Sequence, residues 1–378
     1  MPAPCLTHRV PQSQSGYCRG MTVEQPVGTE GIRAGARVKR ARSRRRRLIG
    51  GALALIVIVA VFVNLLPRIA SYSSVLDVLG SLEPEWIAAL AGIAILNTAT
   101  FGPPWMAAMR GLNYQRSMVL TQTSTALASA IPGGDAVGIA VSWAMLRGWG
   151  FDQHAVAVAV LLTGVWNQVT NVLLPAAALV LLTITGETQP LLATASVLGL
   201  IVMTLVVGVL VAVLWGEQQA RWVGELICRI ASRALRLFGK PPLTGIGDAF
   251  VEFRKQTIHV LRKRWHVLTI ATIVGHLTVF GVLLVALRAC GVDSSQVNWI
   301  EALAAWGLIR LLTAVPITPG GIGIVELGLS AALVGFGGQD ARVVAAVLIY
   351  RALTFLPPVV LGAILGLTWR RHRLPDPA

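Results

Sequence analysis

Long apolar segments, separated by short polar or basic stretches, constrain this chain more than any other feature of its sequence. They span 48–66 and about 86–109, 118–131, 136–147, 154–185, 191–215, 267–289, 299–315, 322–337 and 342–369. A helix that crosses a bilayer needs about 20 apolar residues, because the hydrocarbon core is about 30 Å thick. With 55% apolar and only 13% charged residues, the chain has too little polar surface for a soluble domain. The sequence therefore predicts an all-α, polytopic integral membrane helical bundle.

Four of the segments are too short to cross the hydrocarbon core, and they come as two pairs. At 1.5 Å per residue they reach only about 18–26 Å. Ile131-Pro132-Gly133-Gly134-Asp135 joins the first pair, and Thr318-Pro319-Gly320-Gly321-Ile322-Gly323 joins the second. Proline and paired glycines break helices, so both pairs are predicted to be re-entrant helical hairpins whose tips lie inside the membrane.

Basic residues lie outside the apolar segments and predict the topology. The arm 1–47 is polar, is predicted to be disordered, and ends in nine Lys or Arg without an acid. The 216–266 loop carries ten Lys or Arg against four acids, whereas the 186–190 and 290–298 loops carry one acid each and no Lys or Arg. Six full crossings and two re-entrant hairpins put all basic segments in the cytoplasm, the 110–116 loop and the tail 370–373 included. We therefore expect an inner-membrane domain, 48–378, with cytoplasmic N- and C-termini.

The two hairpins also indicate an internal repeat. Gly148 follows Pro132 at the spacing at which Gly335 follows Pro319. Because the predicted topology puts the two tips on opposite sides, the repeat would be inverted, as in many transporters that alternate access around a midplane site. The alternative is a compact bundle that merely contains two glycine-rich breaks.

Ionisable side chains at membrane depth are costly unless they are paired or hydrated, which makes them candidate site residues. Arg310 and Glu326 lie in the two arms of the second hairpin, where a structural ion pair is the alternative to a functional role. Arg351, beside Tyr350, lies well inside the last apolar segment. Its guanidinium group could hold a headgroup phosphate by a bidentate contact.

The two Pro-Gly-Gly turns are further candidates, because the half-helix after each turn directs free N–H groups at the membrane interior, where they favour an anion. The candidate lipid- or anion-binding residues in the turns are Pro132, Gly133, Gly134, Asp135, Pro319, Gly320, Gly321 and Gly323. For Asp135, a helix N-cap is an equally good interpretation.

Other polar residues favour packing over binding, since polar side chains in membrane helices usually bond to a neighbouring helix. These residues are Asn97, Trp166, Asn167, Asn171 and His276. The segment 217–238 predicts a basic amphipathic helix on the cytoplasmic leaflet, with a partner-docking helix as the alternative. Its apolar face would hold Trp222, Val223, Leu226, Ile227, Ile230, Leu237 and Phe238, and its basic face Arg221, Arg229, Arg233 and Arg236.

Nothing in the sequence predicts covalent chemistry. The four cysteines have no metal-ligand spacing, and no catalytic or nucleotide-binding motif is present. We therefore expect no enzymatic activity, no cofactor and no metal. The net charge of +15 belongs to loops and tails of a membrane protein, so nucleic acid is not an expected partner.

The motifs described above resemble those of the lysylphosphatidylglycerol synthase transmembrane family, also called the flippase-like domain. The resemblance covers roughly 86–369 and is strongest at Thr318-Pro319-Gly320-Gly321-Ile322-Gly323-Ile324-Val325-Glu326. Ile131-Pro132-Gly133-Gly134, Leu146-Arg147-Gly148 and Tyr350-Arg351 also resemble family signatures. The resemblance implies a membrane domain that flips lipids. Two features depart from it: no arginine closely follows the first Pro-Gly motif, and the soluble aminoacyl-transfer domain is missing, so synthase activity is not expected.

Three functions follow from these observations. The first is translocation or binding of a phospholipid or other anionic lipid across the bacterial inner membrane. The second is transport of a small anion or solute by the same inverted-repeat mechanics. The third is a non-transporting membrane scaffold for a cell-envelope enzyme. A cavity open sideways to lipid would favour the first, a closed central cavity the second, and a solid bundle with a conspicuous patch on 217–264 the third.

Overall fold

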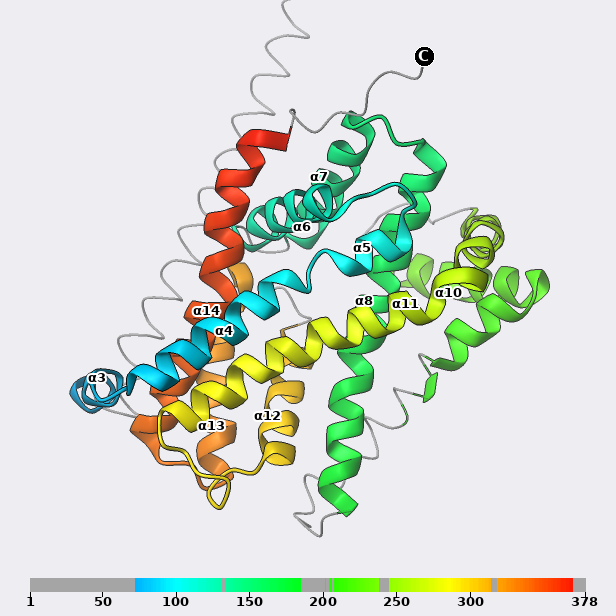
Figure 1. The fold of residues 1–378 in the computed structure, drawn as a ribbon. Helices are drawn as coiled ribbons and strands as arrows, with labels where there is room; N and C mark the ends of the chain where they lie inside the picture. The colour runs from blue at the N-terminus through cyan, green and yellow to red at the C-terminus, as the bar shows by residue number, and fades with distance from the viewer. Residues whose placement is uncertain are drawn as a thin grey trace, which may run out of the picture. The chain divides into compact units, whose positions relative to one another are not determined.

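The computed structural model describes residues 72–130, 134–184, 201, 204–205, 207–237, 245–313 and 318–369. The chain divides into two compact units, 1–50 and 51–378, and all described residues belong to the second. Every regular element in the described ranges is a helix (Figure 1), which confirms the predicted all-α class. In chain order these are α3 (Tyr72–Gly80), α4 (Pro84–Ala99), α5 (Pro103–Ala108), α6 (Tyr114–Ser129), α7 (Asp135–Gly148), α8 (Gln153–Ile184), α10 (Glu217–Leu237), α11 (Ile246–Ala289), α12 (Trp299–Leu312), the short 3-10 helix η2 (Pro319–Gly321), α13 (Ile324–Gly335) and α14 (Asp340–Thr368).

Within the described ranges, four helical stretches are long and apolar enough to cross a membrane. They are Pro84–Ala108, which combines α4 and α5, Gln153–Leu182 in α8, Lys263–Ala289 in α11 and Asp340–Thr368 in α14. These stretches coincide with four of the six predicted crossings. The predicted arm 1–47 and the crossing at 48–66 lie outside the described residues, as do the 186–190 loop and the 370–373 tail. The crossing at 191–215 is described only in part, with 207–215 helical. The count of six crossings stays a prediction.

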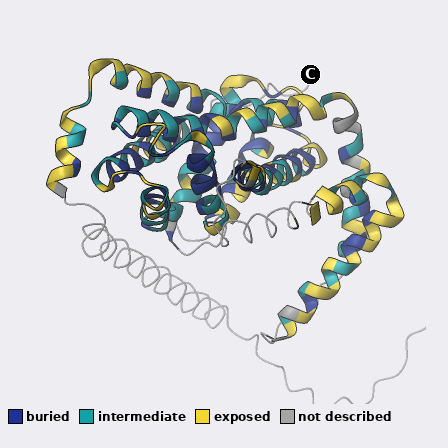
Figure 2. Cartoon of the chain, turned by 90° about the horizontal axis from the view of Figure 1, so that it is seen from below, coloured by how far each residue is buried: buried dark blue, intermediate teal, exposed yellow. Residues whose placement is uncertain are grey.

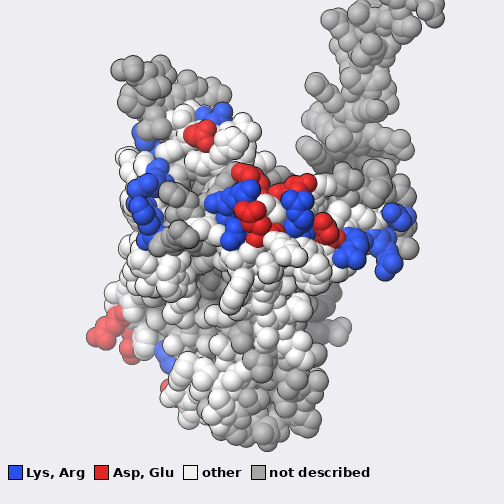
Figure 3. Space-filling model, turned by 90° about the vertical axis from the view of Figure 1, so that its right-hand side faces the viewer, with Lys and Arg blue, Asp and Glu red and all other residues white. Residues whose placement is uncertain are grey.

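The outward faces of the long helices are apolar. On α14, Leu356, Val360, Ile364 and Leu367 follow one another at helical spacing and are between 53% and 86% exposed. On α11, Val267, Ile270, Val274 and Leu277 form a second exposed row. Buried residues lie on the sides of the helices that face one another (Figure 2). In Figure 3, most of the visible charged side chains gather in one band, beside a broad surface with few charges. Because soluble proteins rarely expose such apolar surface, these faces are suited to lipid.

Two pairs of short helices form antiparallel hairpins: α6 packs against α7, and α12 against α13. The chain enters and leaves each hairpin at the same end. A Cβ on Gly111 would lie 3.8 Å from the Phe151 ring at the base of the first, and one on Gly338 would lie 3.3 Å from Val297 at the base of the second. α12 and α13 have 14 and 12 residues. These lengths correspond to about 21 and 18 Å, less than the hydrocarbon thickness. Re-entry of the hairpins into a membrane stays a prediction.

The bases of the two hairpins lie at opposite ends of α14. The helix begins at Asp340, soon after the second hairpin ends at Gly335. At its other end, the backbone carbonyl of Trp369 accepts a hydrogen bond of 2.7 Å from the Trp149 indole, at the base of the first hairpin. If α14 crosses the membrane, the two hairpins therefore open from opposite sides.

Two close contacts between the two halves are reciprocal. A Cβ on Gly362 of α14 would lie 2.2 Å from the Gln122 carbonyl of α6, and one on Gly307 of α12 would lie 2.8 Å from Pro175 of α8. In each case, the first arm of one hairpin packs on the long helix that follows the other hairpin. Pro175 and Gly362 are as far apart in the sequence as the two Pro-Gly-Gly turns. An inverted repeat requires this correspondence, although the repeat itself stays a prediction.

Both long helices that follow the hairpins contain proline. Pro175 lies inside α8, and Pro357 and Pro358 lie inside α14. Proline has no N–H, so the carbonyl four residues earlier loses its usual helical donor. In α14, Leu353 and Thr354 carry the affected carbonyls.

Cysteine labelling tests the inverted arrangement. With the native cysteines replaced, we expect a membrane-impermeant maleimide to label Gln153→Cys from one side of the membrane and Gln339→Cys from the other. Both positions are exposed at the bases of their hairpins. Asp293→Cys is the control and should label with position 339, because a Cβ on Gly337 would lie 3.2 Å from the neighbouring Gln296 carbonyl. Labelling of positions 153 and 339 from the same side would end the inverted-repeat interpretation.

Candidate functional site

The turn of the second hairpin adopts a conformation that only glycine tolerates well. The φ angles of Gly320, Gly321 and Gly323 are +57°, +69° and +88°. In this region a Cβ clashes with the following carbonyl oxygen. A Cβ on Gly320 would in addition lie 2.5 Å from the ring of Phe355 on α14. The glycine-rich motif therefore lets the turn pack closely on α14.

Arg351 of α14 and Glu326 of α13 hold this turn in place. Arg351 Nε donates to Glu326 Oε1 at 2.7 Å, and Arg351 Nη2 donates to the Gly320 carbonyl at 2.8 Å. Glu326 Oε2 accepts the Gly323 N–H at 2.6 Å. The two side chains are only 15% and 6% exposed. Together these bonds link α13, α14 and the turn, and we call this set of four residues the turn clamp.

The turn clamp corrects one interpretation of the sequence. An ion pair between Arg310 and Glu326 is wrong, because Glu326 pairs with Arg351 instead. Arg310 bonds to a residue of α8, whereas Glu326 contacts α14. The role of Arg351 in binding a lipid phosphate stays a prediction. Two nitrogens of its guanidinium group, Nε and Nη2, already donate to Glu326 and Gly320.

Arg310 is surrounded by neutral groups. Its Nε and Nη2 both donate to Asn171 Oδ1 of α8, at 3.1 and 2.8 Å. The guanidinium carbon lies 4.9 Å from the centre of the Trp306 ring, one turn earlier on α12. The Trp306 indole in turn donates to the hydroxyl of Tyr350 on α14 at 3.0 Å. Among the described residues, Arg310 makes no ion pair.

The position of Arg310 along α12 makes its charge unusual. It is the twelfth residue of α12, so it lies about 16 Å along the axis from the start of that helix. Half of the hydrocarbon thickness is about 15 Å. If the second hairpin enters the membrane as predicted, Arg310 would lie near this depth, where a cation is costly unless it faces water or an anion. The Arg351–Glu326 pair has no net charge, so the net positive charge of the group Arg310, Glu326 and Arg351 comes from Arg310.

Amide side chains of α8 connect Arg310 to the surface. Asn171 Nδ2 donates to Gln168 Oε1 at 3.1 Å, and both Gln168 and Asn167 are exposed in the middle of this apolar helix. Asn167 Oδ1 lies 3.1 Å from Nε2 of the buried His276 on α11. We call Asn167, Gln168 and Asn171 the α8 amides. They form a polar strip that leads from the side of α8 to Arg310.

Each of the remaining polar residues bonds to a neighbouring helix, as the packing interpretation predicted. Trp166 donates to Thr269 of α11 at 2.9 Å, and Asn97 of α4 accepts from Thr278 of α11 at 3.3 Å. Asn171 and His276 also bond to other helices, as described above.

The first hairpin is described only in part at its turn. Pro132 and Gly133 lie outside the described residues, and Gly134 is buried, where a Cβ would lie 1.8 Å from the Ala128 carbonyl. Asp135 is exposed and is the first residue of α7, but it makes no capping hydrogen bond, since Gly134 occupies the N-cap. The N-cap interpretation of Asp135 is therefore wrong, and its carboxylate instead interacts favourably with the helix dipole from the first turn.

Two features of this region were not anticipated from the sequence. One is the polar run Thr121-Gln122-Thr123-Ser124-Thr125 in α6, which includes a fully buried Gln122 amide with no hydrogen-bond partner among the described residues. The other is Gln168, which belongs to the α8 amides. Five consecutive polar residues in a predicted membrane segment would have been a usable signal, whereas Gln168 becomes notable only once Asn171 is seen to bond to Arg310.

The described residues contain no group of three or more His, Cys, Asp or Glu that could hold a metal ion. A search of curated proteins finds no match for this chain. A family model described as the lysylphosphatidylglycerol synthase TM region matches residues 48–362, which cover the turn clamp, Arg310 and the α8 amides. This match agrees with the apolar helices in showing a membrane protein linked to lipid or envelope function. The chain belongs to the lysylphosphatidylglycerol synthase transmembrane family.

Proposed function

We propose that this protein binds the headgroup of an anionic phospholipid at Arg310 and translocates the lipid across the bacterial inner membrane without covalent chemistry. The observation that carries the proposal is the charge of Arg310. It is surrounded by an amide, an indole and a phenol, none of which neutralises it. In the predicted re-entrant hairpin this charge would lie near the bilayer centre. An anionic ligand would supply the missing negative charge.

The guanidinium group of Arg310 has donors left for such a ligand. Arginine carries five N–H donors, and the Nε and one N–H of Nη2 point to Asn171. The remaining N–H groups can bind two oxygens of one phosphate, which is the geometry that arginine favours. Asn171 and Trp306 then act as positioning residues for the guanidinium group. Asn171 accepts hydrogen bonds at its edge, and the Trp306 ring lies against its face.

The α8 amides give the headgroup a polar route to Arg310. Asn167 and Gln168 are exposed in the middle of α8, where the other exposed residues, such as Leu161, are apolar. An amide exposed to lipid tails would lose its hydrogen bonds to water, so this strip is suited to a lipid headgroup or to water that accompanies it. A lipid could then keep its tails in the bilayer while its headgroup moves along the strip.

The proposal includes an orientation of the chain in the membrane. We place the basic segments, among them the 216–266 loop, on the cytoplasmic side, with both termini there. The two hairpins, opening from opposite ends of α14, would alternately expose the Arg310 site to each leaflet.

Reconstitution tests this function. We expect purified protein in liposomes to equilibrate acyl-labelled phosphatidylglycerol between leaflets faster than acyl-labelled phosphatidylcholine, as measured by dithionite bleaching of the outer leaflet. Protein-free liposomes are the control. Equal rates with and without protein would overturn the proposal. Efflux of a small anion such as radiolabelled acetate, without lipid movement, would instead support the solute transporter.

A further inference from the structure

α10 carries a cationic surface that is separate from Arg310. The helix packs against α11 through the buried residues Ala220 and Val223, and a Cβ on Gly224 would lie 2.8 Å from the Gly247 backbone. Arg221 pairs with Asp248 of α11 at 2.9 Å. The face predicted to be uniformly apolar is therefore divided, because α11 covers Val223 but leaves Trp222 and Ile230 exposed at 57% and 63%.

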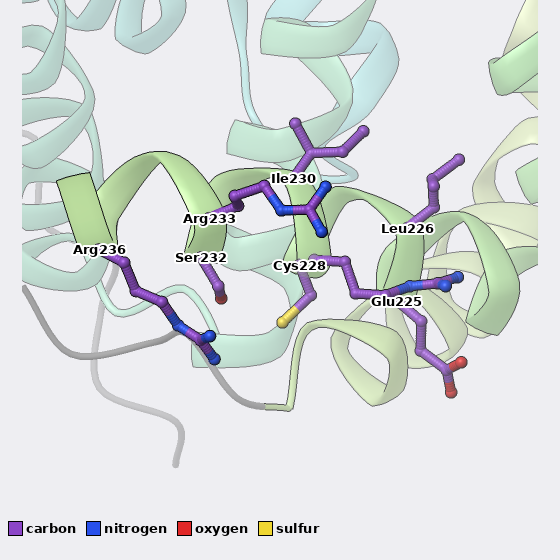
Figure 4. Close-up of a pocket in the computed structure, with 8 residues that line it drawn as sticks. Glu225, Leu226, Cys228, Ile230, Ser232, Arg233 and Arg236 are labelled. Carbon is purple, nitrogen blue, oxygen red and sulfur yellow. The ribbon is translucent and has the colours of Figure 1, made fainter.

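The outward side of α10 combines these apolar side chains with arginines. Arg229, Arg233 and Arg236 follow one another at helical spacing, are exposed, and make no ion pair with any described acid. They line an open concavity of about 620 Å³ (Figure 4). The other lining residues are Glu225, Leu226, Cys228, Ile230 and the buried Ser232. One acid against three arginines leaves the concavity cationic.

α10 also begins close to a membrane segment. Helical residues 207–215 end two residues before Glu217, the first residue of α10. Arg254 of α11 donates to the carbonyls of Leu214 and Trp215 at 3.3 and 3.4 Å, which ties the α10–α11 pair to the end of that segment. Since 191–215 is a predicted crossing, α10 starts at the level of the lipid headgroups.

We propose that the outward face of α10 binds the headgroups of anionic phospholipids at the bilayer surface. The three arginines supply positive charge over two turns, and Ile230 and Trp222 supply apolar groups beside them that can enter the headgroup region. Tryptophan is enriched at this depth because its ring is apolar and its N–H is polar. Arginines at an anionic leaflet add electrostatic attraction, as in other interfacial helices. This combination fits a charged lipid surface better than an acidic protein, which needs no exposed indole beside the cations.

Hydrogen exchange on the intact protein tests this contact. In nanodiscs that contain phosphatidylglycerol, we expect peptides from 217–237 to exchange up to roughly 100-fold more slowly than in phosphatidylcholine nanodiscs, since each arginine near an anionic leaflet contributes about fivefold. The variant Arg229→Gln/Arg233→Gln/Arg236→Gln should lose the difference, and high salt should reduce it. Arg221→Gln is the matched control and should keep it, because Arg221 is engaged with Asp248.

The variants separate the outcomes. All four arginines are exposed, so the helix should exchange alike in every variant in phosphatidylcholine, which checks its folding. Equal protection of 217–237 in both lipid compositions would overturn the proposal, as would retained protection in the triple variant. Lack of protection in either composition would also overturn it and would favour an acidic protein partner. The result does not depend on whether Arg310 supports lipid translocation.

Discussion

Replacing Arg310 by glutamine is expected to slow phosphatidylglycerol translocation by about 10- to 100-fold in reconstituted liposomes. A hydrogen bond from a charged donor is worth about 1.5–3 kcal/mol, and each 1.4 kcal/mol is a factor of about ten. Glutamine can still bond to Asn171, so the α8–α12 contact should persist while the charge is lost. Arg310→Lys should have an intermediate rate, because it keeps the charge and loses the bidentate geometry.

A second variant tests the same charge without altering the arginine. Asn171→Asp would place a carboxylate where the amide oxygen now accepts from Arg310 at 2.8 Å. The resulting ion pair should hold the arginine and exclude an anionic headgroup, so translocation should fall while the thermal stability of the protein does not. The matched control is Arg342→Gln, which removes an arginine that donates to the Gly291 carbonyl from the start of α14. Rates in Arg310→Gln and Asn171→Asp that match the wild type would remove Arg310 from the site.

Replacing Glu326 by alanine should destabilise the folded protein by about 3–5 kcal/mol, the usual cost of leaving a buried charge unpaired. Glu326 is 6% exposed and accepts from both Arg351 and the Gly323 N–H, so its loss opens the turn clamp at two points. The turn should then lose its fixed position on α14. Denaturation in mixed micelles measures the loss of stability. The mobility of a label on the second hairpin measures the loss of the turn's fixed position.

The double variant Glu326→Ala/Arg351→Met distinguishes charge from packing. Removing both charges also removes the desolvation cost, so we expect the double variant to be more stable than Glu326→Ala alone. Glu326→Gln should fall between them, because it can retain a bond to the Gly323 N–H. If the destabilisation of the double variant equals the sum of those of Glu326→Ala and of Arg351→Met alone, the ion pair does not hold the turn.

The helices and turns were predictable from the sequence, because apolar length and helix-breaking residues act locally. α7 was predicted at 136–147 and spans Asp135–Gly148, and α13 was predicted at 322–337 and spans Ile324–Gly335. The glycines of the second turn were predictable for the same reason, since their left-handed backbone is a local requirement.

The pairing inside the site was not predictable, because it depends on how each helix is rotated. Glu326 had two arginines, Arg310 and Arg351, among its candidate partners, and the spacing along the chain does not choose between them. The choice is made by the contacts of α12 with α8 and of α13 with α14. The division of the α10 face follows the same logic, since periodicity shows which residues share a face but not how much of that face a neighbouring helix covers.

The prolines of α14 determine where this helix can bend at the lowest cost in free energy. Arg351, which holds the second hairpin, lies before Pro357 and Pro358, and Gly362, which contacts the first hairpin, lies after them. Two missing backbone bonds between these attachment points concentrate the mechanical compliance of the helix in a single turn. α14 thus consists of two rigid helical segments joined by a flexible turn, and each segment contacts one of the two hairpins.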